Sequence, residues 1–253
     1  MNGDSRRVAL RVSYDGTNYS GWQRQENADS VQARIEKALH ALTGQEIGVT
    51  GASRTDAGVH ALGQTVHFDN PSRIPADRFC YALNTRLPDD IRVTASCAAA
   101  EDFHARFNAR GKTYRYLIDN SRHGTAMYRH FMAHVPQPLD AALMDAAAKD
   151  LLGEHDFAAF AAAGSVAKTT VREIWRADVQ RNGDAIELTV AGKSFLYNMV
   201  RIIAGTLIYI GMGKLPPESL KKALETKDRL DLGITAPARG LTLMEVYYDC
   251  HLW

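Results

Sequence analysis

The fold is decided first by Val8-Ala-Leu-Arg-Val-Ser-Tyr14, where apolar and polar residues alternate as in a strand, and by Asp15-Gly-Thr-Asn18, which ends it as a turn. After this turn, apolar residues recur at helical spacing between Ser30, a suitable N-cap, and Gly44, a suitable C-terminal stop. The same signals predict a helix over 75–83 and strands over 47–50, 64–68 and 91–95. The first part of the chain therefore runs strand, helix, strand, strand, helix, strand.

The second part of the chain repeats this order. Its expected elements are a strand over 113–118, a helix over 139–152, a hairpin of 171–179 and 185–191, helices over 195–210 and 217–227, and a strand over 243–248. We predict an α+β fold with two ferredoxin-like βαββαβ halves, 1–104 and 105–253, each an antiparallel sheet with helices on one face. The uncovered faces of the two sheets are expected to meet at a central cleft.

The composition is that of an ordinary globular protein. Of 253 residues, 45% are hydrophobic, and 30 Lys and Arg stand against 29 Asp and Glu, a formal charge of +1. This argues against disorder and against a uniformly basic nucleic-acid binder, although a local basic patch is compatible with it. The three cysteines form no C-x-x-C pair, residues 1–7 lack the apolar core of a secretory signal, and the apolar run 202–212 is too short to span a bilayer. We therefore expect a cytoplasmic protein.

The loop Arg54-Thr-Asp56-Ala-Gly58 is the sharpest chemical feature of the sequence. It places a carboxylate beside a glycine between two predicted strands, where catalytic groups commonly sit on a rigid scaffold. The alternative is that Asp56 only forms a turn and that Arg54 is a surface charge, because Asp and Gly favour turns for local reasons. Both interpretations are open from the residues alone.

Other catalytic schemes fit the sequence less well. No Walker lysine follows a glycine-rich loop, no G-x-G-x-x-G follows a strand, and the segment that begins at Gly51 lacks the second glycine of a nucleophile elbow. His130 and His134 are four residues apart but lack the glutamate of a zinc-protease helix, so partly buried histidines are the simpler interpretation. Nothing requires a metal or an organic cofactor, and we expect neither.

Arg201 interrupts the otherwise apolar stretch from Phe195 to Ala204, which we expect to be helical. A buried guanidinium without an anion is costly, so this side chain either reaches solvent or has a fixed carboxylate partner. Asp56 is the candidate, and such a pair would keep its carboxylate ionised, as a nucleophile or base requires. A purely structural ion pair is the alternative.

A basic and aromatic stretch follows at 104–116. It places Arg106, Arg110, Lys112 and Arg115 among Phe107, Tyr114 and Tyr116, and the surface could be extended by Arg6, Arg7, Arg11, Arg24, Lys168 and Arg172. Cations can hold phosphates while an aromatic ring stacks on an unpaired base, which indicates RNA as the ligand. Alternatively, the stretch is a solvated edge strand whose aromatics, Tyr114 or Tyr116 among them, belong to the core.

Several blocks of the sequence, spread over 14–241, form a recognisable pattern. They are Tyr14-Asp-Gly-Thr-Asn-Tyr-Ser-Gly-Trp-Gln-Arg24, Gly51-Ala-Ser-Arg-Thr-Asp-Ala-Gly-Val-His-Ala61, Gly63-Gln-Thr-Val-His-Phe68, Phe103-His-Ala-Arg-Phe107, Lys112-Thr-Tyr-Arg-Tyr116, Asn198-Met-Val-Arg201 and Thr235-Ala-Pro-Ala-Arg-Gly-Leu241. In this order they closely resemble the tRNA pseudouridine synthase A family. The resemblance covers nearly the whole chain, from 8 to 248.

The resemblance implies an intramolecular transferase that isomerises uridine to pseudouridine at positions 38, 39 and 40 of the tRNA anticodon arm. It also implies a homodimer that needs no cofactor and that binds tRNA in basic clefts. The target base of the tRNA is then flipped out of the base stack. Asp56 matches the catalytic aspartate of the family, and Tyr114 the tyrosine that lies against the target base. Arg54 matches the arginine that displaces that base, and Arg201 the basic partner of the aspartate.

Two other interpretations stay open on physical grounds. A non-catalytic RNA-binding module would share the ferredoxin-like sheets, although the signature aromatics of RRM domains are not evident. A different cofactor-free enzyme on the same scaffold is the second, because fold alone does not fix function. Replacing Asp56 distinguishes a binder from a synthase, since a binder has no activity to lose whereas a synthase loses turnover.

Overall fold

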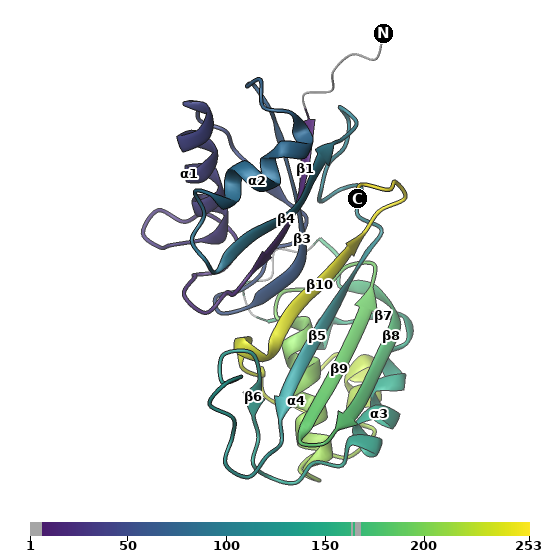
Figure 1. Ribbon diagram of the computed structural model, residues 1–253. Coiled ribbons are helices and arrows are strands. Elements are labelled where there is room, and N and C mark those ends of the chain that lie inside the picture. Colours follow the sequence, from purple (N-terminus) through teal and green to yellow (C-terminus); the bar gives the residue numbers. More distant parts are fainter. Residues whose placement is uncertain (1–6, 163, 165–167) are drawn as a thin grey trace. The chain divides into compact units, whose positions relative to one another are not determined.

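The computed structural model describes residues 7–162, 164 and 168–253 (Figure 1). It is a mixed α/β protein whose chain forms two compact units. The first unit consists of Met1–Arg110 and Leu243–Trp253, and the second of Gly111–Thr242. The chain therefore leaves the first unit at Arg110 and returns to it within its last strand. No helix in the described part of the chain is long and apolar enough to cross a membrane.

The first unit is built on an antiparallel sheet. Its strands are β1 (Arg7–Tyr14), β2 (Thr50–Gly51), β3 (His60–Asp69) and β4 (Ile91–Ala98), and the C-terminal strand β10 (Leu241–Tyr247) also pairs with β3. β1 lies between β3 and β4, and β2 pairs with β3. The strands predicted over 64–68 and 91–95 lie within β3 and β4, so these two predictions are confirmed.

Two helices of the first unit lie together beside its sheet (Figure 1). α1 (Val31–Thr43) begins at Ser30, whose hydroxyl accepts an N–H of the first turn, and ends at Gly44 in the left-handed conformation with φ 71°. Both predicted caps are therefore confirmed. α2 (Phe79–Asn84) directly follows a 3-10 turn, Ala76–Arg78, and together they account for the predicted second helix.

The core of the first unit lies between these helices and one face of the sheet. The ring of Phe68 on β3 packs edge-on against Phe79 of α2, with the ring centroids 5.0 Å apart. Phe68 is paired with Val8 of β1, which continues the apolar face to the next strand. Because side chains alternate along a strand, His67 points to the face that the helices do not cover.

The strand predicted over 47–50 is wrong except at its end, because pairing with β3 begins only at Thr50. Side chains of α1 hold the preceding residue instead: the N–H of Val49 donates to Oε1 of Glu36 (3.1 Å), and its carbonyl accepts from Nε2 of Gln32 (3.1 Å). Backbone groups that are satisfied by side chains do not need a neighbouring strand. This segment therefore runs alongside α1 without joining the sheet.

The second unit contains an antiparallel sheet in the order β5-β9-β8-β7. Its strands are β5 (Gly111–Asp119), β6 (Ala133–His134), β7 (Gly153–Asp156), β8 (Val171–Asn182) and β9 (Ala185–Gly192), with β6 parallel to β5. The predicted hairpin is confirmed, since β8 and β9 are joined by a tight turn in which Gly183 takes φ 59°. The sequence pattern does not predict β6 or β7, which are short and lack an apolar alternation.

The helices of the second unit, within the described residues, are α3 (Ala141–Ala148), α4 (Met199–Gly211) and α5 (Ser219–Thr226), with 3-10 turns at Lys149–Leu151, Ala158–Phe160, Arg229–Asp231 and Ala238–Gly240. The prediction that a helix starts at 195 is wrong, because the helix starts only after Asn198. That residue is left-handed, with φ 61°. Asn tolerates this conformation better than most residues, and it interrupts the apolar run before the helix can begin.

Candidate active site

The loop between β2 and β3 is held in place by buried polar side chains. The amide of Gln64 bonds to Ser53 twice: its Oε1 accepts the N–H of Ser53 (3.2 Å), and its Nε2 donates to the Ser53 carbonyl (2.6 Å). The hydroxyl of Thr55 lies 2.7 Å from that of Tyr14, again in a buried position. Because water does not compete for these contacts, they fix the backbone of the loop.

Arg54 and Asp56 alternate along the chain with Ser53 and Thr55, the two residues that these contacts hold. Ser53 and Thr55 are 9% and 7% exposed, whereas Arg54 is exposed and Asp56 is half-buried. The carbonyl of Asp56 accepts the N–H of Val59 (3.1 Å), which closes the turn. The structure therefore places these two predicted site residues on one fixed turn, with the residues on either side of Arg54 held inward.

A second segment, 16–22, packs on this turn at two glycines. A Cβ on Gly21 would lie 2.5 Å from the carbonyl oxygen of Thr55, and a Cβ on Gly16 would lie 2.0 Å from the carbonyl oxygen of Val59. Only glycine allows the two backbones to approach so closely. The sequence pattern does not predict this structural support for the loop, although Gly16 and Gly21 are the residues that allow it.

The substitution Gly21→Ala is expected to disturb the loop as well as the local backbone. The added methyl group meets the Thr55 carbonyl at a residue with φ 93°, so we expect the free energy of unfolding to fall by about 1–3 kcal/mol. Gly44→Ala is the matched control, because Gly44 also has a positive φ (71°) but has no atom within 4 Å of the added Cβ. Denaturant unfolding compares the two variants, and equal destabilisation would contradict a close contact with the loop.

β5 carries the two predicted tyrosines. Tyr116 is fully buried, its hydroxyl donates to the carbonyl of Pro237 (2.8 Å), and burial raises its pKa above the usual value, against a smaller opposing effect of Arg201. Tyr116 is therefore a core residue. Tyr114 is 6% exposed, and its ring packs edge-on against Phe195 with centroids 5.1 Å apart. That contact fixes the ring of Tyr114, whose place against a target base is still a prediction.

Arg201 lies in the first turn of α4 and is partly buried. Its Nε donates to the carbonyl of Ala236 (2.8 Å), and its Nη1 donates to Oδ1 of Asn198 (2.7 Å). Neither acceptor is charged, so these two bonds orient the guanidinium without neutralising it. The predicted pairing of Arg201 with Asp56 joins residues of different units, and no contact described here tests it.

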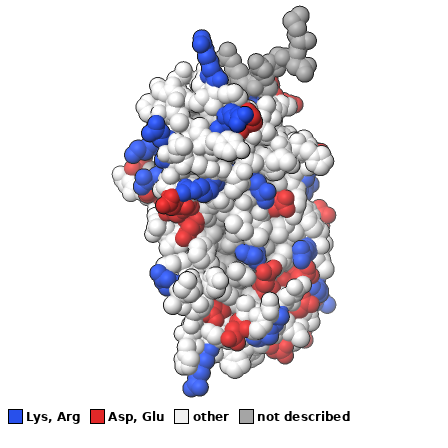
Figure 2. Space-filling view, in the orientation of Figure 1, with Lys and Arg blue, Asp and Glu red and all other residues white. Residues whose placement is uncertain are grey.

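The predicted basic surface is partly neutralised by carboxylates. The ion pairs are Arg7–Asp69 (2.9 Å), Arg24–Glu36 (3.2 Å), Arg110–Asp249 (2.5 Å) and Arg115–Glu187 (3.9 Å). Figure 2 shows Lys and Arg side chains interspersed with Asp and Glu side chains over the face that it presents. Arg6, which was included in this surface, lies outside the described residues. The stretch 104–116 is thus not a simple row of unpaired cations.

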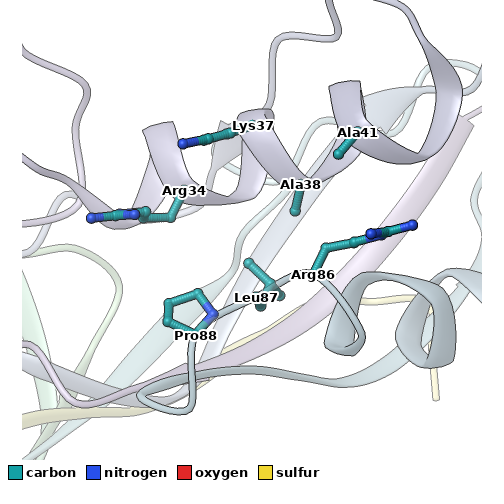
Figure 3. Close-up of a pocket in the computed structure, with 7 residues that line it drawn as sticks. All are labelled: Arg34, Lys37, Ala38, Ala41, Arg86, Leu87 and Pro88. Carbon is teal, nitrogen blue, oxygen red and sulfur yellow. The ribbon is translucent and has the colours of Figure 1, made fainter.

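The cavity shown in Figure 3 does not include the predicted site residues. It has a volume of about 320 Å³ and is lined by Arg34, Lys37, Ala38, Ala41, Arg86, Leu87 and Pro88. The guanidinium of Arg34 is bonded to the carboxylate of Asp29 through Nε and Nη2, so one of the three cations is already paired. Among the described residues, no group of three or more His, Cys, Asp or Glu side chains is placed to hold a metal ion.

The family of this chain follows from its sequence similarity to known proteins. A family model described as tRNA pseudouridine synthase matches residues 11–108 and 147–249. The tRNA pseudouridine synthase A of Ruminiclostridium cellulolyticum is 52% identical over 244 residues, and that of Acetivibrio thermocellus is 51% identical over 243; each alignment covers 96% of this chain and 100% of the relative. A solved Cbf5-Nop10-Gar1 complex aligns with a TM-score of 0.40 at 13% identity, over 95% of this chain and 50% of that one. The chain belongs to the tRNA pseudouridine synthase family, whose members isomerise uridine to pseudouridine in tRNA.

Proposed function

We propose that this protein isomerises uridine to pseudouridine at positions 38, 39 and 40 in the anticodon arm of tRNA, with Asp56 as the catalytic carboxylate. The observation that carries the proposal is the fixed turn in which buried Ser53 and Thr55 alternate with Arg54 and Asp56. Family membership supports the reaction class. The three positions are those of the tRNA pseudouridine synthase A family that the sequence resembles.

The reaction exchanges one bond of the nucleoside for another. The C1′–N1 bond breaks, the uracil turns, and C1′ joins C5, which loses its proton while N1 gains one. No electrons enter or leave, so a positioned carboxylate needs no redox cofactor. Asp56 can add to C6 or attack C1′ as a nucleophile, or remove a sugar proton as a base to give a glycal. Each of these roles requires an ionised carboxylate beside the nucleoside.

The target uridine must leave the base stack before Asp56 can reach it, at a cost of a few kcal/mol. Arg54 is exposed on the same turn, and we assign it to the space that the base vacates. Tyr114 lies against the flipped base and offsets the lost stacking. The positive charge of Arg201 favours the ionised form of the Asp56 carboxyl.

The proposal extends to architecture and assembly. We infer two ferredoxin-like βαββαβ halves, 1–104 with the aspartate loop and 105–253 with Tyr114 and Arg201. The antiparallel order β4-β1-β3-β2, with helix α2 packed on one face, supports this assignment for the first half. We also infer a homodimer in the cytoplasm, as the family resemblance and a tRNA substrate imply.

Unmodified tRNA transcripts with a single anticodon-arm uridine, at position 38, 39 or 40, test the assignment. After incubation with the protein, carbodiimide labelling and reverse transcription are expected to detect pseudouridine at each position in turn. A transcript with cytidine at all three positions is the matched control and should stay unmodified there. Pseudouridine found only outside the anticodon arm would refute the positions, and none in any tRNA would refute the reaction.

A further inference from the structure

In the segment 103–107, the ring of His104 stacks on the ring of Phe107, an exposed residue of the first unit. The ring centroids of His67 and His104 are 4.8 Å apart, and His104 stacks on Phe107 at 4.2 Å with an interplanar angle of 29°. Phe107 is nevertheless 74% exposed, and Cζ of Arg106 lies 5.6 Å from its ring centroid. One face of the Phe107 ring is therefore backed by protein, while most of the side chain is open to solvent.

The stack is anchored to the face of the sheet that the helices do not cover. His67 points to that face because the next residue of β3, Phe68, packs on α2. Nδ1 of His67 accepts the N–H of Ala105 (3.1 Å), and the Ala105 carbonyl accepts the hydroxyl of Tyr248 (2.5 Å). Ala105 is itself fully buried, so the backbone is fixed on both sides of this residue.

The imidazole of His104 fixes the conformation of Phe107. Its Nδ1 accepts the N–H groups of Arg106 and Phe107, both at 3.2 Å. This arrangement requires the neutral imidazole, because a protonated ring has no acceptor. Burial and the nearby Arg7 lower the pKa of His104, and burial lowers the pKa of His67 to about 4. Both rings are therefore uncharged at neutral pH, and the Phe107 ring keeps its position.

We propose that the outward face of Phe107 is a stacking platform for an unpaired nucleobase of the tRNA, and that Arg106 contacts the adjoining phosphate. This inference rests on the proposed function, since it takes tRNA as the ligand. Proteins that hold single-stranded nucleic acid combine aromatic rings with nearby cations in this way. A nucleic acid suits the site better than a protein partner, because the guanidinium of Arg106 beside the ring supplies the cation that a phosphate requires.

Equilibrium binding of an unmodified tRNA transcript to Phe107 variants tests the platform. Phe107→Ala is expected to raise Kd by about 5- to 150-fold, the range that corresponds to stacking one base on an aromatic ring. Phe107→Leu should resemble the alanine variant, because it restores apolar bulk without a π face, whereas Phe107→Trp should bind about as tightly as wild type. Tyr81→Ala is the matched control, since Tyr81 on α2 is 69% exposed and should not affect Kd.

Pseudouridine formation by the wild-type protein is measured alongside Kd. A failure of the proposed function can then be distinguished from a failure of the stacking platform. Wild-type protein that modifies no tRNA contradicts the proposed function, whereas active wild type with an unchanged Kd in Phe107→Ala contradicts the platform alone. A Phe107→Leu variant that binds as tightly as wild type also contradicts it, because apolar bulk would then suffice. An RNA-free Phe107→Ala protein with an altered sedimentation coefficient and an unchanged Kd would instead make this face a protein interface.

Discussion

Asp56→Asn is expected to slow pseudouridine formation by at least about 100-fold while leaving the affinity for tRNA close to that of wild type. Asparagine keeps the size of the side chain but cannot act as a nucleophile or a base. The buried bonds that hold the turn are made by Ser53 and Thr55, and they persist in the variant. Chemistry is therefore lost without loss of the fold or of the RNA-binding surface.

The factor by which turnover falls in Asp56→Asn distinguishes a general base from a covalent nucleophile. A general base contributes about 10²–10⁴-fold, whereas loss of a covalent nucleophile costs on the order of 10⁶-fold. Single-turnover kinetics of Asp56→Asn and wild type measure the difference. Asp77→Asn is the matched control, because its side chain is 68% exposed in the same unit, and it should keep wild-type turnover. Undiminished turnover by Asp56→Asn would remove this residue from the chemistry.

Arg201→Leu is expected to lower turnover by about 10²–10³-fold, the effect of removing one preorganised electrostatic contact. The proposed pairing with Asp56 favours the ionised carboxylate, so its loss should move the acidic limb of the pH–rate profile to higher pH. The variant also leaves the acceptors on Ala236 and Asn198 unpaired, which costs about 1–3 kcal/mol of stability. Thermal unfolding measures this structural part separately from the kinetics.

Asn198→Gly separates the effect of the Arg201 charge on the kinetics from the effect of the Arg201 hydrogen bonds on stability. Glycine keeps the left-handed conformation at this position (φ 61°) but removes the Oδ1 that accepts from the guanidinium. We expect a small loss of stability, with the acidic limb of the profile unmoved, because the charge of Arg201 is retained. An Arg201→Leu variant with wild-type kcat and an unmoved acidic limb would refute the pairing with Asp56.

Local sequence signals predict those elements whose ends are fixed by interactions within a single turn of the chain. Ser30 and Gly44 bound α1 because capping is decided within one helical turn. The hairpin around Gly183 follows in the same way from its turn residues. The start of α4 is different, because an apolar pattern does not show that Asn198 is left-handed, and the helix begins only at Met199.

Elements that depend on distant partners could not be predicted locally. β7 (Gly153–Asp156) is a polar strand that is defined by its pairing with β8. The bonds of Val49 to α1, which keep it out of the sheet, are also tertiary. Arg110 and Asp249 form their ion pair across 139 residues of sequence, so a cation in an apparently basic stretch is neutralised by a remote carboxylate.

The sequence indicates which residues could carry out the chemistry of the candidate site, but it does not show how these residues are arranged in space. Arg54 and Asp56 stand out as charged residues in a glycine-containing loop, and the resemblance assigns them roles. The burial of Thr55 between them depends on Tyr14, which lies 41 positions earlier in the chain. No local pattern reports such a contact, so the fixed conformation of the turn is information that only the structure supplies.

Release of tritium from tRNA transcripts labelled at C5 of uridine tests the central claim most directly. Joining C1′ to C5 must expel the hydrogen of C5, so each completed isomerisation delivers its label to water. We expect wild-type protein to release tritium and Asp56→Asn to release it at least about 100-fold more slowly, with tRNA binding intact in both. Equal release by the variant, or no release from any tRNA despite tight binding by wild type, would contradict a synthase that works through Asp56.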